Sequence, residues 1–98
     1  MPGHISNERK QALCKILASN LPTLRTKAKL SQNELSDRLG FSRQTISAIE
    51  GCKRDMQWST FSAITLFLSK DREVNQLMSV MGVLDDDVKE ALNLVEDD

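Results

Sequence analysis

Two short helical segments, joined through the three residues 40–42, constrain the fold of this chain more than any other feature. Ser31 stands where a helix N-cap is expected, and an acidic residue three positions later completes a capping box. Gly40 ends this segment, because glycine accepts the left-handed backbone angles that let a chain leave a helix abruptly. Ser42 then caps the second segment. Since a three-residue connection cannot wander, the segments 31–39 and 42–50 must pack against each other at an angle.

Most of the remaining chain also predicts helices. Apolar residues recur at spacings of three and four, and no stretch alternates apolar and polar residues over the length of a strand. This pattern predicts an all-α fold, a compact bundle of about five to seven short helices without a sheet. The later apolar stripes are Trp58, Phe61, Ile64 and Leu68, then Val74, Leu77, Met78 and Met81 up to Gly82, and lastly Val88, Ala91, Leu92 and Val95 after the acidic residues 85–87.

An additional helix is predicted near the beginning of the chain, over residues 7–19. Its N-cap is Ser6 or Asn7, and its apolar face carries Leu13, Ile16 and Leu17. Pro22 interrupts the pattern, because proline lacks a backbone N–H and biases the residue before it away from helical angles. The segment 20–28 is therefore either a second helix or the kinked continuation of the first.

Length and composition indicate one ordinary globular domain over residues 1–98. Hydrophobic residues make up 40% of the chain and charged residues 28%, which argues against disorder, a fibre or a membrane protein. No apolar run approaches the roughly 18 residues that a spanning helix needs, and the polar beginning lacks the apolar stretch of a secretion signal. We therefore expect a cytoplasmic protein.

The residues that usually carry catalysis or bind metals do not cluster. Cys14 and Cys52 form no closely spaced pair and no group with His4, the only histidine, so neither a metal site nor a disulfide framework is indicated. We expect two buried or half-buried thiols. The sequence also has no phosphate-cradling glycine loop and no Ser, His and acid set. We therefore expect neither an enzyme nor a cofactor.

The formal net charge of −1 hides a split between the two halves of the chain. Through Arg54 there are ten Lys or Arg against four Asp or Glu, a net charge of +6, and from Asp55 onward three against ten, a net charge of −7. A cationic half beside an anionic half favours one face for phosphates and another for a different purpose. The alternative is that these charges only solvate the surface.

The segment 42–50 has the properties that reading of DNA bases requires. A recognition helix is short, buries one edge, and exposes in its first turns side chains that hydrogen-bond base edges in the major groove. Ile46 and Ile49 supply the inward edge. Arg43 can pair with guanine and Gln44 with adenine, and each such pair discriminates by about 1 to 3 kcal/mol.

The stretch LSQNELSDRLGFSRQTISAIE at 30–50 closely resembles the helix-turn-helix of the phage repressor and Cro family, often called the XRE family. A looser match extends to LPTLR at 21–25 and to the segment 58–68. The resemblance implies a lambda repressor-like helix-turn-helix inside a DNA-binding core at 20–68. The helix at 7–19 and the C-terminal helices at 71–98 would then be additions to this core.

The resemblance also implies roles for individual residues, each weighed against a plain solvated side chain. Base contacts are implied for Ser42, Arg43, Gln44, Ser47 and Ala48. Phosphate contact is implied for Gln32, with Thr45, Lys53 and Arg54 as further candidates for backbone contact. Arg25 and Glu50 are implied to form a partly buried ion pair that ties the preceding helix to the end of the recognition helix.

Three residues depart from the family pattern. Ser36 stands at the tight crossing of the two helices, where the family usually has Ala, and Thr65 replaces another Ala. Cys52 replaces the Gly that commonly follows the recognition helix, although Gly51 just before it can serve as the helix stop. These departures affect the expected geometry of the loop at 51–56 more than the expected fold.

Single modules of this kind bind DNA weakly, so we expect a homodimer on a two-fold symmetric site. The candidate dimer contacts are Leu66, Phe67, Val74, Leu77, Met78 and Met81. Alternatively, the extra N-terminal helix covers these residues within one chain. The acidic end, residues 85–98, is either a solvated helix, a device against self-association, or a docking surface for a protein partner.

Three functions fit the sequence. The first is a transcriptional regulator that reads double-stranded DNA, expected to be a repressor that occupies an operator. The second is an antitoxin that binds its own operator and neutralises a toxin protein through its terminal segments. The third is a protein-interaction module that keeps the fold without DNA binding, against which the outward positions of Arg43 and Gln44 argue.

Overall fold

Six helices make up the part of the chain that a computed structural model describes, residues 4–94. They are α1 (Asn7–Lys27), α2 (Gln32–Leu39), α3 (Arg43–Glu50), α4 (Trp58–Leu68), α5 (Arg72–Met81) and α6 (Asp86–Ala91). This described part contains no strand. The prediction of an all-α bundle is therefore confirmed. None of the described helices is both long and apolar enough to cross a membrane.

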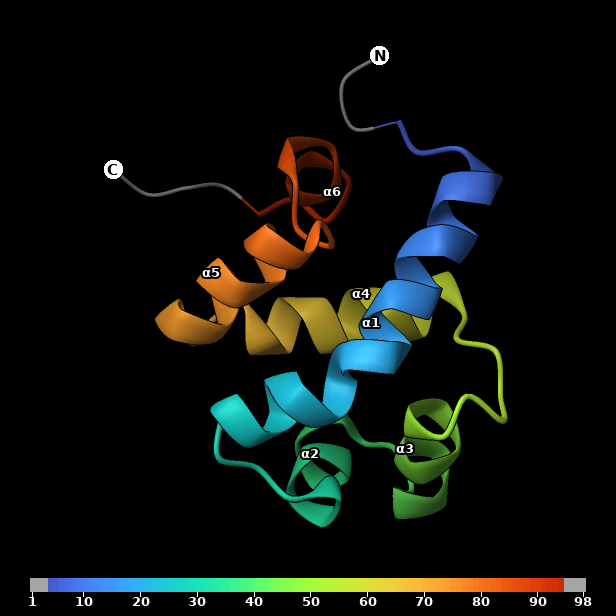
Figure 1. The fold of residues 1–98 in the computed structure, drawn as a ribbon, viewed down its shortest axis with the longest axis vertical. Coiled ribbons are helices and arrows are strands. Elements are labelled where there is room, and N and C mark those ends of the chain that lie inside the picture. Colours follow the sequence, from blue (N-terminus) through green and yellow to red (C-terminus); the bar gives the residue numbers. More distant parts are fainter. Residues whose placement is uncertain (1–3, 95–98) are drawn as a thin grey trace.

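The first helix runs through Pro22 without a break. Ser6 caps it by accepting a hydrogen bond from the Arg9 N–H at 3.2 Å, and the helix continues to Lys27. Its axis changes direction in the second half (Figure 1), as expected where a proline removes a hydrogen-bond donor. Leu21 and Leu24 on either side of Pro22 are fully buried, so packing holds this stretch helical. The segments 7–19 and 20–28 are thus one bent helix.

The buried face of α1 differs from the predicted one at Ile16. This side chain is 37% exposed, whereas Leu13 and Leu17 are buried as predicted. The buried face instead includes Cys14 and Ala18, which follow Leu13 and Leu17 around the helix. The difference arises because the partners of α1, which are α3, α4 and α5, lie on the side to which Cys14 points.

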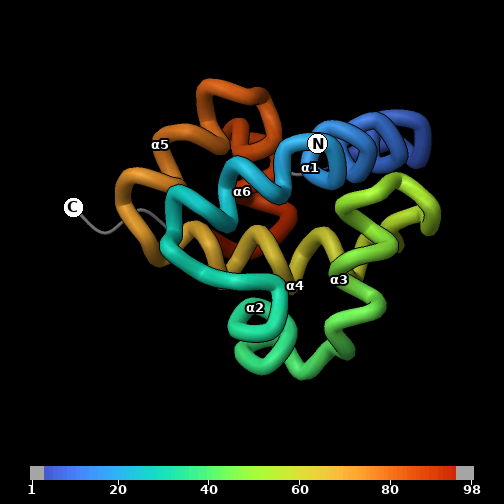
Figure 2. The backbone as a smooth tube through the Cα atoms, turned by 60° about the horizontal axis from the view of Figure 1, so that its bottom comes forward, coloured from blue at the N-terminus to red at the C-terminus, as the bar shows by residue number. Residues whose placement is uncertain are grey.

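The helices arrange themselves around α1 and α4. α1 contacts α3, α4 and α5, while α2 packs against α3 and α4 (Figures 1 and 2). In Figure 1, α2 and α3 lie at one end of the molecule, and α6 lies with the beginning of α1 at the other. The largest fully buried side chains are Phe61, Leu17, Leu21, Leu24, Leu35, Ile46, Ile49, Ile64, Leu68, Met78, Leu84 and Val74. One core therefore joins both ends.

α4 buries the apolar stripe that its sequence predicts, and it also buries one polar side chain. Phe61 is fully buried, and the half-buried Trp58 stacks on it with 4.5 Å between ring centroids. The ammonium of Lys10 lies 5.3 Å from the Trp58 ring. The Thr65 side chain is also fully buried, and its hydroxyl has no hydrogen-bond partner among the described residues. Thr65 therefore occupies an apolar site that suits the Ala usual in the family.

α5 and α6 complete the core from the C-terminal side. α5 ends at Gly82, whose φ of 85° is the left-handed angle that the sequence predicts there. α6 ends at Ala91, so the predicted last helix is shorter than its apolar stripe, and Val95 lies outside the described residues, as do residues 96–98. Arg9 of α1 forms ion pairs with Asp85 and with Asp87, the latter at 3.2 Å. The first and last helices are thereby joined.

Two of the candidate dimer contacts are not on the surface. Val74 and Met78 are fully buried in the chain's own core, so they cannot contact a second folded copy, and this prediction is wrong for them. The spacing that suggested an interface is the spacing with which α5 faces its own chain. On the outer side of α5, Val80 is 84% exposed, which the sequence analysis did not anticipate.

Candidate nucleic-acid interface

The turn between α2 and α3 has the predicted construction. Gly40 ends α2 with a φ of 75°, and the N–H of Phe41 donates to the Ser36 carbonyl at 3.0 Å. Ser42 is extended and caps α3 by accepting a hydrogen bond from the Thr45 N–H at 3.1 Å. A Cβ added at Gly40 would meet no atom within 4 Å. Glycine is therefore needed here for its backbone angle and not for space.

α3 has one buried edge and one exposed face. Ile46 and Ile49 are buried, whereas Arg43, Gln44 and Ser47 are exposed. The implied contact residues Thr45 and Ala48 are half-buried. The Ser42 hydroxyl is exposed and hydrogen-bonded to the Thr45 hydroxyl at 2.9 Å, so these two side chains stabilise the start of the helix. The face that remains for a ligand is formed by the exposed residues of α3.

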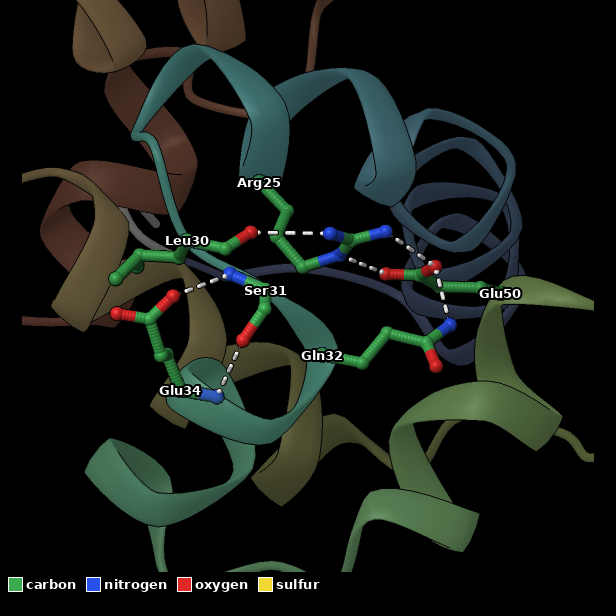
Figure 3. A network of polar contacts seen from close by, with 6 residues as sticks. All are labelled: Arg25, Leu30, Ser31, Gln32, Glu34 and Glu50. Atoms are coloured by element: carbon green, nitrogen blue, oxygen red, sulfur yellow. Dashed lines mark hydrogen bonds and ion pairs between the residues drawn. The ribbon is translucent and has the colours of Figure 1, made fainter.

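A polar network connects Glu50, at the end of α3, to residues of the preceding helices (Figure 3). Arg25 of α1 donates to both carboxylate oxygens of Glu50, from Nε at 2.8 Å and from Nη2 at 3.1 Å. Its Nη1 also donates to the Leu30 carbonyl at 3.0 Å. The two charged side chains are only 17% and 7% exposed. The hydrogen bonds from Arg25 to Glu50 raise the pKa of the guanidinium above its ordinary value.

Gln32 belongs to the same network, which the sequence analysis missed. Its Nε2 donates to Glu50 Oε1 at 3.0 Å, so the side chain links the first turn of α2 to the last turn of α3. Gln32 is half-buried, unlike the exposed residues of α3. No spacing in the sequence indicates this hydrogen bond, because the two residues meet only after α2 and α3 have packed against each other.

The beginning of α2 shows the predicted capping box. The Ser31 hydroxyl accepts from the Glu34 N–H at 3.0 Å, and the Glu34 carboxylate accepts from the Ser31 N–H at 3.0 Å (Figure 3). The backbone hydrogen bond from Ser31 lowers the pKa of the Glu34 carboxyl. This short-range interaction fixes where α2 starts, and with it the position of Gln32.

The loop after α3 differs from the expectation. Gly51 ends α3 with an ordinary φ of −83°, and the left-handed residue is Cys52, with a φ of 56°. Cys52 is exposed, so the prediction of a buried or half-buried thiol is wrong for it, whereas Cys14 is buried. Burial raises the pKa of the Cys14 thiol. Lys53 and Arg54, candidate phosphate contacts, are both exposed in this loop.

Comparison with known proteins supports the assignment that the geometry suggests. Residues 23–50 match the family described as helix-turn-helix, and this match spans the last turn of α1, residues 23–27, together with α2 and α3. No match was found among curated proteins or among solved structures. Over residues 23–50 the chain is therefore similar to the helix-turn-helix family, in agreement with the resemblance of this stretch to the phage repressor and Cro proteins.

Proposed function

We propose that this protein is a sequence-specific transcriptional regulator that reads the major groove of double-stranded DNA with α3. The observation that carries the proposal is the split of α3 into a buried edge at Ile46 and Ile49 and an exposed face bearing Arg43, Gln44 and Ser47. These are side-chain types that discriminate bases by hydrogen bonding. Ser42 and Ala48 lie at the margins of that face.

Phosphate contacts would surround this face and fix its orientation. Lys53 and Arg54 are exposed in the loop that directly follows α3. At the start of α2, helix N-terminal amides favour an anion, and Gln32 lies there. Contacts of this kind position a protein on DNA without reading sequence. A regulator bound in this way over a promoter would most simply act as a repressor, because it blocks access to the promoter.

Selection from random DNA duplexes tests the proposal. The full chain is expected to enrich a defined sequence, and Arg43→Ala or Gln44→Ala should each cost about 1 to 3 kcal/mol of binding free energy and relax the preference at one position. Lys53→Ala is the matched control. It should weaken binding to all duplexes alike and reduce the slope of affinity against salt by about one ion.

Two results would contradict the proposal. The first is the absence of enrichment at low salt, which would favour a protein-interaction module instead. The second is an unchanged selected sequence with Arg43→Ala, Gln44→Ala and Ser47→Ala combined. Circular dichroism of each variant confirms that the helices are intact.

A further inference from the structure

Both cysteines of the chain line the same cavity. It has a volume of about 550 Å³ and lies between the first half of α1, which supplies Cys14 and Lys15, and the loop after α3, which supplies Cys52 and Arg54. The two thiols are 38 positions apart in the sequence, and the chain has no third cysteine. Folding therefore brings the only two thiols of the chain to the lining of one cavity.

The two thiols differ in their exposure and in the kind of segment that carries them. Cys14 is 6% exposed on a helix that the core holds in place, and burial raises the pKa of its thiol. Cys52 is exposed in the loop at 51–57, which has no helix or strand, and its φ of 56° is one that most side chains avoid. Solvent oxidants therefore reach Cys52 first, and the loop is the wall that can move.

We propose that Cys52 and Cys14 form a reversible disulfide across this cavity when the protein meets a peroxide. The Cys52 thiolate attacks one oxygen of hydrogen peroxide and the O–O bond breaks, which gives a sulfenic acid and a hydroxide ion, and this hydroxide takes up the proton that the Cys52 thiol had released and becomes one water. The Cys14 sulfur then attacks the Cys52 sulfur, the S–O bond breaks, and the released hydroxide takes up the Cys14 proton as a second water. Two thiols lose two electrons, and one peroxide gains them.

The bond requires the cavity to close. A disulfide holds its two Cα atoms about 4.4 to 6.8 Å apart, so the loop must approach α1. Lys53 and Arg54 stand directly after Cys52 and move with it. This consequence rests on the proposed function: phosphate contacts from these residues would be displaced, and oxidation would weaken DNA binding.

Intact mass and thiol counting of the full chain test the bond without reference to DNA. Treatment of the reduced protein with hydrogen peroxide is expected to give a single chain lighter by about 2 Da, the two lost hydrogens, with both thiols gone and both restored by dithiothreitol. The rate should not depend on protein concentration. Cys14→Ala should instead stop at oxidised Cys52, and Cys52→Ser should keep its remaining thiol.

Three outcomes would contradict the proposed disulfide. One is a disulfide-linked dimer as the main product, another is independent oxidation of Cys52 alone in the wild type, and the third is faster bond formation in urea than in buffer. The last would show that the unfolded chain, and not the folded cavity, brings the thiols together.

A second measurement tests the consequence for DNA. The oxidised wild type should bind its selected duplex at least tenfold more weakly than the reduced form, and dithiothreitol should restore the affinity. Cys52→Ser should show no such change. If the disulfide forms without any loss of DNA affinity, oxidation does not control DNA binding. If no duplex is ever selected, the proposed function fails while the mass result still decides the bond.

Discussion

At the scale of single residues, the ion pair between Arg25 and Glu50 has the strongest influence on the geometry of the interface. Both charges are largely removed from water, and the Glu50 carboxylate accepts hydrogen bonds from two other helices. A buried charge that loses its partner is more costly than two charges removed together. The pair therefore specifies the position of α3 more than it adds net stability.

This argument predicts a non-additive pair of mutations. Arg25→Met should lower the free energy of unfolding by about 3 kcal/mol, because it leaves Glu50 charged and nearly buried. The double variant Arg25→Met with Glu50→Leu should lose less than the Arg25 single variant. Urea unfolding of both single variants and the double variant measures the coupling. Equal losses in all three would show that the pair has no such role.

The family resemblance implied the pair of Arg25 and Glu50, whereas the other features that depend on tertiary contacts were not predicted from the sequence. The capping box of Ser31 is local, and it is visible in the sequence because donor and acceptor are three residues apart. The hydrogen bond from Gln32 to Glu50 joins residues 18 positions apart on two helices. Cys52 at a left-handed φ contradicts the ordinary preference for glycine, so only the structure reveals it.

At the scale of elements, the turn at Gly40 determines how α3 is presented. Gly40→Ala should destabilise the protein by about 1 kcal/mol, since an L-residue pays that much for left-handed angles even where its Cβ meets nothing. Gly51→Ala is the matched control. Gly51 has an ordinary φ, and its added Cβ would lie 3.4 Å from the Ser47 carbonyl oxygen, so little change is expected.

Chemical denaturation compares these two glycine variants directly. A loss at Gly51 equal to that at Gly40 would mean that the left-handed angle is not the reason for glycine in the turn.

The helices that could be predicted from the sequence are those whose ends are set by local interactions. Helices with local caps were predicted close to their ends, whereas the continuity of α1 through Pro22 depends on burial of Leu21 and Leu24, which no local pattern specifies.

At the scale of the whole molecule, the outer side of α5 is the surface that most needs a partner. Val80 is 84% exposed. Leu77, three positions before it, and Met81, directly after it, are half-buried, as is Phe67, while Leu66 of α4 is exposed. Where such groups form one contiguous apolar patch, the patch is typical of an interface. We expect a homodimer that uses these residues, so that two copies of α3 contact a symmetric site.

Analytical ultracentrifugation without DNA measures this expectation. The full chain should sediment at twice its 11.0 kDa at micromolar concentrations. Val80→Asp should weaken association by about tenfold or more, since a charge would be placed in an apolar contact. Gln76→Ala, on an exposed polar residue of the same helix, is the control. A monomeric wild type would contradict the expected dimer.

The ion pairs from Arg9 to Asp85 and Asp87 have a practical consequence for anyone handling this protein. They gather the beginning of α1 and the start of α6 at the end of the molecule that lies away from α2 and α3 (Figure 1). A fluorophore or affinity handle attached near either position would project away from α3. Binding titrations with a dye placed there would therefore report on the unobstructed protein.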